Sequence, residues 1–315
     1  MATVLCVVGP TATGKTKMGV ALARRFNGEV VSVDSMQIYR GMAVGTAAPT
    51  AEEMEGVPHH MVAVVDPAES WSVARYVQAA DACVQDILSR GRLPVLVGGT
   101  GLYLDALIRG TDFAAGSQGT GIRQALQQRA RTEGVEVLLE ELRKIDPAAA
   151  EKLHLRDEKR IIRALEVWQE TGQTITEHDR LSRQQPPRYD AVWLGLDFAD
   201  RALLYGRIDR RVEQMVADGL LDEVRTLNEQ GLQEGKTASR AIGYAQFARV
   251  LEDEDYSVEQ AIEDTTIATR QFARRQLTWF RADPRVHWLD ALSPTLVDEA
   301  LAIIRAEGAP AAVSS

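Results

Sequence analysis

The sequence predicts an α/β fold, with a parallel β-sheet flanked by helices and an all-helical domain inserted into it. Apolar runs alternate with helical periodicity over residues 1–111, which is typical of a parallel sheet covered on both faces. Only helical patterns follow, until an apolar run at 191–196 returns the chain to the sheet. The predicted domains are a core formed by 1–115 and 191–315 and an insertion formed by 116–190.

Short apolar runs predict the strands, and apolar residues at 3.6-residue spacing predict the helices. Residues 110–121, rich in Gly, Ser and Thr, interrupt the alternation and are interpreted as a hinge. The helix that precedes Gly172 is predicted to end there, with this glycine as its C-cap. In chain order the elements are strand 4–8, helix 15–26, strand 29–34, helix 72–90, strand 93–97, helices 101–108, 122–131, 135–145, 147–154 and 157–171, strand 191–196, helices 201–218, 220–230, 239–251 and 258–280, and strand 286–289.

Residues 9–16, Gly-Pro-Thr-Ala-Thr-Gly-Lys-Thr, fill the pattern G-x-x-x-x-G-K-[ST] directly after the first strand. The glycines let successive backbone N–H groups face inward, Lys15 adds a positive charge, and Thr16 can hold a Mg²⁺ ion. The following helix presents the positive end of its dipole to an anion. The motif therefore predicts a P-loop NTPase-like core that binds a diphosphate or triphosphate, the alternative being a glycine-rich turn. The predicted phosphate ligands are Gly9, Thr11, Ala12, Thr13, Gly14, Lys15 and Thr16.

Two further segments follow predicted strands. Residues 34–41, Asp-Ser-Met-Gln-Ile-Tyr-Arg-Gly, come after the second strand, and residues 97–103, Val-Gly-Gly-Thr-Gly-Leu-Tyr, end the third strand and open a helix. The carboxyl ends of parallel strands meet at one edge of a sheet, where doubly wound folds bind ligands. We therefore expect Asp34 and Thr100 to lie in one crevice with the phosphate loop.

Composition bounds the class of protein. The 315 residues are 45% hydrophobic, which is ample for a buried core, and Cys6 and Cys83 are too isolated for a disulfide framework or a zinc site. No apolar run has membrane-spanning length, and residue 1 leads straight into a strand without a signal peptide. We expect a cytoplasmic monomer without membrane contact.

The net charge of −9 by itself argues against nucleic-acid binding. Clustered basic residues can offset the total, because local patches bind phosphates, although solvated helix faces are the alternative. The clusters are Arg156, Lys159, Arg160 and Arg163; Arg180, Arg183 and Arg188; Arg207, Arg210 and Arg211; and Arg270, Arg274, Arg275, Arg281 and Arg285.

Nearly end to end, the chain resembles the tRNA dimethylallyltransferases, also called tRNA isopentenyltransferases. After Gly45-Thr46 it departs from the family pattern, since 47–49 read Ala-Ala-Pro where most relatives carry Ala-Lys-Pro, so that a lysine contact is missing. The matching segments are the phosphate loop, 34–41, Gly45-Thr46, Pro58-His59-His60, 97–103, the helix 160–167, Ala241-Ile242-Gly243-Tyr244, and 269–281 with its run Arg274-Arg275-Gln276-Leu277-Thr278-Trp279-Phe280-Arg281.

The resemblance implies transfer of a dimethylallyl group from dimethylallyl diphosphate to N6 of the adenosine just 3′ of a tRNA anticodon. In that reaction Asp34 matches the general base and Thr100 the threonine at the bridging oxygen of the diphosphate; the alternatives are a Mg²⁺-shell aspartate and an N-cap threonine. The phosphate loop would hold the leaving diphosphate, with Mg²⁺ at Thr16. Arg160, Arg207 and Arg211 fall at family positions associated with the diphosphate or the tRNA. The sequence does not show which of the two ligands each arginine contacts. The expected tRNA contacts are Ser35, Gln37, Arg163, Arg270, Arg274, Arg275 and Arg281.

Other interpretations stay open. A P-loop small-molecule kinase could recruit Asp34 and Arg160, and a related enzyme could prenylate a free adenine nucleotide instead of tRNA. The pairs His59-His60 and Trp279-Phe280 are either stacking platforms for bases or parts of the core, and for the aromatic pair we expect the core.

Overall fold

The computed structural model describes residues 2–111, 121–235 and 237–308, without the side chain of Arg183. It divides into two compact units, which are described separately. The core unit comprises Met1–Ile108 and Tyr189–Ser315, and the helical unit comprises Arg109–Arg188. The predicted boundary at 115 and most of the predicted hinge at 110–121 lie outside the described residues.

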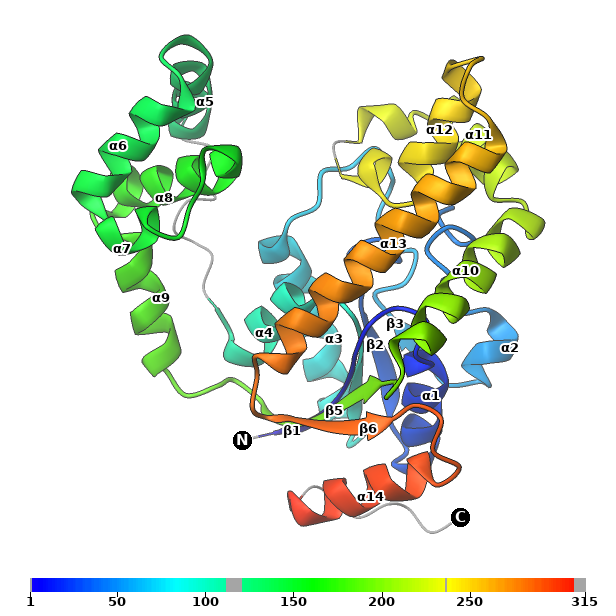
Figure 1. Cartoon of the computed structure of the whole chain (residues 1–315). Coiled ribbons are helices and arrows are strands. Elements are labelled where there is room, and N and C mark those ends of the chain that lie inside the picture. The colour runs from blue at the N-terminus through cyan, green and yellow to red at the C-terminus, as the bar shows by residue number, and fades with distance from the viewer. Residues whose placement is uncertain (1, 112–120, 236, 309–315) are drawn as a thin grey trace. The chain divides into compact units, whose positions relative to one another are not determined.

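The core unit is built on a six-stranded sheet in which all neighbouring strands are parallel, in the order β3-β2-β4-β1-β5-β6 (Figure 1). Strand β1 is central, with Leu5 in register with both Val95 and Val192. The predicted α/β fold with a parallel sheet is therefore confirmed. The strands are β1 (Thr3–Val8), β2 (Glu29–Val33), β3 (His59–His60), β4 (Pro94–Gly98), β5 (Asp190–Asp197) and β6 (Val286–Asp290).

Strand β1 is apolar and buried from Val4 to Val8 because helices cover both faces of the sheet. Its alternate residues enter two different clusters: Val4, Cys6 and Val8 lie in one, and Leu5 and Val7 in the other. Helix α3 (Val73–Ser89) packs into the first cluster, while α1 (Lys15–Arg25) and α14 (Leu296–Ala306) pack into the second. Cys6 is a free thiol in the core, as its apolar neighbours predicted.

Figure 1 shows the long helix α13 (Val258–Arg281) running beside α10 (Arg201–Ala217). These two helices pack against the phosphate loop, as described below. No helix in the described part of the chain is long and apolar enough to cross a membrane. The remaining helices of this unit are α2 (Ala51–Met54), α4 (Gly101–Arg109), α11 (Leu220–Glu229) and α12 (Tyr244–Glu252).

In the core unit one predicted helix begins late, and the elements α2, β3 and α14 were not predicted. The predicted helix 239–251 begins only at Tyr244, because Gly243 has φ of 90° and its N–H donates to the side chain of Gln246. The two-residue edge strand β3 was not predicted, since two residues carry no periodicity. Helix α14 was also missed, although its apolar face reaches the core through Ile304.

The helical unit has its own apolar core, made by Leu126, Leu138, Leu142, Ile161 and Leu165. The predicted helix 147–154 was too long: it ends at Ala150, and His154 instead begins a 3₁₀ turn whose Asp157 accepts the His154 N–H at 3.0 Å. Gly172 is the predicted C-cap, with φ of 70°. The helices are α5 (Ile122–Thr132), α6 (Val135–Ile145), α7 (Pro147–Ala150), α8 (Glu158–Thr171) and α9 (Ile175–Gln184).

Candidate active site at the carboxyl edge of the sheet

The two glycines of the phosphate loop have different tasks. Gly9 has φ of 139°, and a Cβ there would lie 2.3 Å from the carbonyl oxygen of Leu196, so this glycine allows the loop to approach β5. Gly14 has φ of 87°, and a Cβ there would meet nothing within 4 Å. Gly14 therefore supplies a left-handed turn that faces open space just before α1, where an anion is favoured.

Internal bonds hold the rest of the loop. The hydroxyl of Thr13 and the ammonium of Lys15 both donate to the carbonyl of Pro10, at 2.9 and 2.6 Å. Ala12 has φ of 66°, its methyl group is buried beside Phe198, and its carbonyl accepts a hydrogen bond from Arg207 Nε at 2.8 Å. A non-glycine residue stays in this conformation only when its surroundings hold it there. The loop is therefore preorganised by α10 and by its own side chains.

Charges of both signs act on Lys15. Desolvation, and after it the nearby positive charge of Arg211, lower the pKa of Lys15 to about 7, against the opposing effect of the Asp34 carboxylate. Burial also lowers the pKa of Arg211, again against the effect of Asp34. Two cations thus share a desolvated site near the carboxylate of Asp34. An anionic ligand would restore the charge balance.

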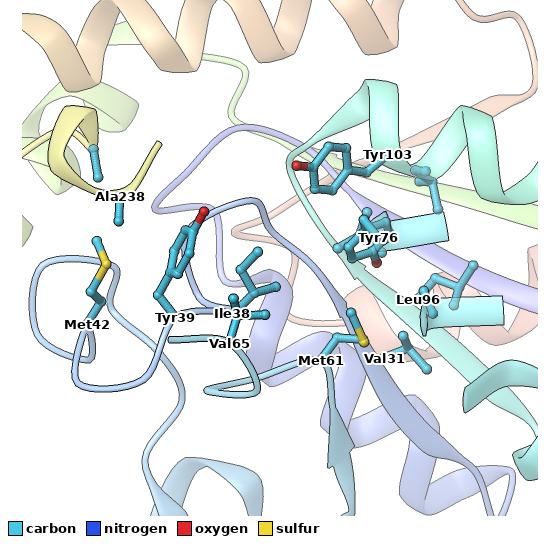
Figure 2. Close-up of a cluster of buried hydrophobic side chains, with 14 of the residues drawn as sticks. Val31, Ile38, Tyr39, Met42, Met61, Val65, Tyr76, Leu96, Tyr103 and Ala238 are labelled. Atoms are coloured by element: carbon cyan, nitrogen blue, oxygen red, sulfur yellow. The ribbon is translucent and has the colours of Figure 1, made fainter. Parts of the chain in front are cut away.

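Asp34 follows β2 and is partly buried. Its Oδ1 accepts hydrogen bonds from the backbone N–H groups of Met36 at 2.8 Å and Gln37 at 3.2 Å. These bonds fix the carboxylate in a tight Asx-type turn and both use the same oxygen. The loop beyond it is anchored in the core by Ile38, Tyr39 and Met42, as Figure 2 shows.

Thr100 lies against the segment that carries Asp34. Its Oγ1 accepts a hydrogen bond from the N–H of Ser35 at 3.2 Å, and its own N–H donates to the carbonyl of Val33 at 3.2 Å. At Gly98 a Cβ would lie 2.0 Å from that same carbonyl, so only glycine permits this approach. The hydroxyl of Thr100 thus binds the Asp34 segment, while its backbone carbonyl accepts the N–H groups of Tyr103 and Leu104 in α4.

The carboxamide of Gln37 already has partners within the protein. It accepts a hydrogen bond from the hydroxyl of Ser32 at 2.9 Å and donates to the carbonyl of Ala47 at 3.2 Å. The same loop is held by Glu223 of α11, whose carboxylate accepts the backbone N–H groups of residues 43–45 at 2.8 to 3.1 Å. A contact between Gln37 and tRNA would have to share or replace these bonds.

The predicted arginines differ in their surroundings. Arg207 and Arg211 lie on α10 beside the phosphate loop, whereas Arg160 belongs to the helical unit, is 74% exposed and lies 3.6 Å from Asp157. Arg274 and Arg275 of α13 are exposed. The other arginines predicted to contact tRNA form ion pairs: Arg163 with Glu166, Arg270 with Asp209, and Arg281 with Asp197.

The two residue pairs interpreted as stacking platforms or core, Trp279-Phe280 and His59-His60, have different surroundings. Phe280 is buried, as expected, but Trp279 is 48% exposed and covers Gly101, where a Cβ would lie 2.2 Å from the indole. His60 bonds the buried carboxylate of Glu29 at 2.7 Å, and His59 bonds the carbonyl of Val57 at 2.9 Å. The side chains of both histidines therefore form hydrogen bonds that hold the edge strand β3 in this structure.

Sequence reasoning missed Gln276 and Glu223. Gln276 is 5% exposed on α13 and bonds both the phosphate loop and the segment before Thr100. A signal was present, because residue 276 falls on the apolar face with Ala273, Leu277 and Phe280, where a polar residue needs a partner. Glu223 gave no such signal, since acidic residues are common in the first turn of a helix.

The residues present fit a magnesium ion. Thr16 lies in the first turn of α1 and offers a hydroxyl oxygen, a donor type that Mg²⁺ accepts. Across the described residues, no group of three or more His, Cys, Asp or Glu is placed to hold a metal. Mg²⁺ is usually held by few protein oxygens together with substrate phosphates and water.

A preorganised phosphate loop after β1, a carboxylate directly after β2 and two arginines of α10 define a P-loop α/β protein with an anion site at the carboxyl edge of its sheet. The chain belongs to the IPP transferase family: the model of that family matches residues 37–283, and the isopentenyl transferase model matches residues 2–63.

Named relatives cover most of the chain. It is 46% identical over 286 residues to the tRNA dimethylallyltransferase of Halalkalibacterium halodurans, covering 91% of this chain and 90% of that protein. The enzyme of the same name from Caldanaerobacter subterraneus is 44% identical over 286 residues, covering 90% of each.

Two solved structures are also similar. The full-length tRNA isopentenylpyrophosphate transferase of Bacillus halodurans has a TM-score of 0.72 and 40% identity, with 98% of each chain covered. A eukaryotic dimethylallyltransferase acting on tRNA has a TM-score of 0.83 and 27% identity, with 99% of this chain and 81% of that chain covered.

Proposed function

We propose that this chain transfers a dimethylallyl group from dimethylallyl diphosphate to N6 of the adenosine 3′-adjacent to the anticodon of tRNA, and releases diphosphate. The observation that carries the proposal is the direct link between the Asp34 segment and Thr100, beside a preorganised phosphate loop. The names of the relatives supply the substrates. The acceptor implies a cytoplasmic enzyme, and we propose that it acts as a monomer.

The phosphate loop and its cations would stabilise the leaving group. As the allylic C–O bond stretches, negative charge grows on the diphosphate, and fixed donors are most effective at that point. Backbone N–H groups around Gly14, together with Lys15, Arg207 and Arg211, supply positive charge at this edge of the sheet. When bound at Thr16, Mg²⁺ would neutralise further charge on the phosphate oxygens. The hydroxyl of Thr100 keeps its proton available for the bridging oxygen, because its bond to Ser35 uses only a lone pair.

Asp34 would act as the general base. The exocyclic amine of adenine is a weak nucleophile, so a carboxylate that accepts its proton assists formation of the new C–N bond. The two backbone N–H groups that bind Asp34 Oδ1 orient the carboxylate and hold it in place. The proton thus passes from N6 to Asp34 while the electron pair of the broken C–O bond leaves with the diphosphate.

Binding of tRNA by a chain of net charge −9 requires localised arginines. In the core unit we assign this role to Arg274 and Arg275 on α13. In the helical unit, considered by itself, we assign it to Arg160 and Arg163. The base to be modified must leave its stack to reach Asp34, which is easier in a single-stranded anticodon loop than in a duplex.

One label-transfer experiment separates this function from its alternatives. The protein is incubated with Mg²⁺, a tRNA pool, free AMP and either dimethylallyl diphosphate labelled in its allyl group or ATP labelled in its γ-phosphate. We expect allyl label in tRNA and, after digestion, in N6-dimethylallyladenosine. Transfer of the ATP label to any acceptor would instead identify a P-loop kinase. Allyl label on free AMP but not on tRNA would identify an adenine-nucleotide prenyltransferase.

A further inference from the structure

Gln276 connects three segments that are far apart in the sequence. It lies on α13 and is 5% exposed. Its Oε1 accepts a hydrogen bond from the backbone N–H of Thr11 in the phosphate loop at 2.9 Å. Its Nε2 donates to the backbone carbonyl of Gly99, the residue before Thr100, at 3.0 Å. One side-chain amide therefore joins the phosphate loop to the segment that carries Thr100.

The fit around this amide is close. A Cβ at Gly99 would lie 1.9 Å from Nε2 of Gln276, so a side chain at residue 99 would displace the glutamine. The planar carboxamide matches one donor, the N–H of Thr11, to one acceptor, the carbonyl of Gly99. The bond to Gly99 is buried and the bond from Thr11 is partly buried, so losing the glutamine would leave poorly solvated polar groups unsatisfied.

We propose that Gln276 is a positioning residue for the group-transfer step. It fixes the separation between the phosphate loop and Thr100, two parts of the site that must act on the same diphosphate. Gln276 itself touches neither substrate in this assignment. The inference rests on the proposed function, because it assigns the loop and Thr100 to one leaving group. Misplacement of reacting groups by about 1 Å can reduce a rate roughly 100-fold.

Three variants test the proposal in the full chain. Gln276→Met keeps the length of the side chain but removes both hydrogen bonds. Gln276→Glu keeps an acceptor for Thr11 and, when ionised, places a second oxygen against the carbonyl of Gly99. Thr265→Val is the matched control on the same helix, because Thr265 is 2% exposed and its hydroxyl has no hydrogen-bond partner among the described residues.

We expect Gln276→Met to lower kcat roughly 100-fold at saturating tRNA and to weaken the binding of Mg²⁺-diphosphate, while the Kd for an anticodon stem-loop changes less than about twofold. Gln276→Glu should regain activity relative to wild type as the pH falls, because a protonated carboxyl can again donate to Gly99 while accepting from Thr11. Thr265→Val should match wild type in all of these measurements.

The outcomes are separable. A lower Tm with unchanged kcat in Gln276→Met would show that Gln276 serves folding alone and would overturn the proposal. If Gln276→Met does not fold, a pH-independent kcat ratio between Gln276→Glu and wild type overturns it instead. Failure of the proposed function appears elsewhere, as the absence of dimethylallyladenosine with the wild-type enzyme.

Discussion

Thr100 Oγ1 and Ser35 N lie 3.2 Å apart, and this hydrogen bond joins the loops that follow two adjacent strands. Ser35 is the neighbour of Asp34, so the bond ties the proposed base to the proposed contact with the leaving group. In such an arrangement the general base Asp34 and the hydroxyl that contacts the leaving group belong to one rigid unit. The positions of both groups are then set before substrate binds, which lowers the cost of orientation in the reaction.

Asp34→Asn should retain the folded loop but lower kcat by roughly two to four orders of magnitude, the usual value of a positioned base. The amide oxygen of asparagine can still accept the N–H groups of Met36 and Gln37, so the substitution removes charge and basicity without removing the turn. Single-turnover transfer to tRNA measures the effect, with Tm and tRNA affinity as controls. Near-normal turnover in the folded variant would exclude Asp34 as the base.

Local motifs identified the phosphate loop, Asp34 and Thr100, because each follows a strand whose carboxyl end lies at the same edge of the sheet. They did not identify Gln276, since its partner Thr11 is 265 residues away and no local pattern encodes such a contact. Ion pairing of Arg281 with Asp197 was likewise invisible in the sequence. Local chemistry could thus be predicted, whereas the long-range bonds that hold it in place required the fold.

The predicted helix boundaries were wrong where a single residue decided the backbone conformation. Apolar spacing continues through 239–251, but the positive φ of Gly243 separates a 3₁₀ turn from helix α12. The first residue of the helix, Tyr244, is buried, and its ring lies against Gly45. The helical pattern was correct only for the part beyond that turn.

Lys15 should take up a proton when diphosphate binds. Its pKa is lowered to about 7 in the ligand-free protein, so it is mostly neutral at pH 8, and the anion raises that pKa again. Calorimetry in buffers of different ionisation enthalpy should show an uptake at pH 8 that exceeds that of Lys15→Arg by about one proton. The difference should disappear towards pH 6, where Lys15 is already charged. Equal uptake by the two proteins at pH 8 would contradict the lowered pKa.

Glu29 should make stability fall in acid. Hydrogen bonds from Arg90, His60 and Arg92 lower the pKa of its carboxyl from 4.5 to about 2 despite burial. A lowered folded-state pKa stabilises the protein above the unfolded value, and that stability is lost as the pH falls from about 4.5 towards 2. Glu29→Gln should therefore cost up to about 3 kcal/mol at pH 7 and progressively less in acid.

Urea unfolding at pH 7 and pH 3 checks this expectation. Glu55→Gln is the matched control, because Glu55 pairs with Arg24 on the surface, where both side chains are about half exposed, at 47% and 62%. Surface pairs of this kind contribute little, so this variant should differ from wild type by less than about 1 kcal/mol at both pH values. If the Glu29→Gln protein were as stable as the Glu55→Gln protein at pH 7, the buried carboxylate of Glu29 would contribute nothing to the free energy of unfolding.

Replacement of Arg274 and Arg275 together by Ala should weaken tRNA binding and reduce its dependence on salt. Each lost phosphate contact reduces the slope of log K against log salt by roughly 0.7 to 0.9, so two contacts predict a change of about 1.6. Both side chains are exposed on α13, which makes them available to phosphates in the free protein. Adding Arg281→Ala should change the slope by less than the loss of one full phosphate contact does, since Arg281 must first leave Asp197 to bind a phosphate.

The matched control is the double variant Arg24→Ala and Arg25→Ala, another exposed consecutive pair, at the end of α1. Because α1 begins at the phosphate loop and runs away from it, these arginines lie at the opposite edge of the sheet, and their loss should leave the slope unchanged. Affinity for Mg²⁺-diphosphate should be unaltered in both variants. If the Arg274 and Arg275 variant kept the wild-type slope while folded, α13 would not be the tRNA surface, and the arginines of the helical unit would have to carry the binding instead.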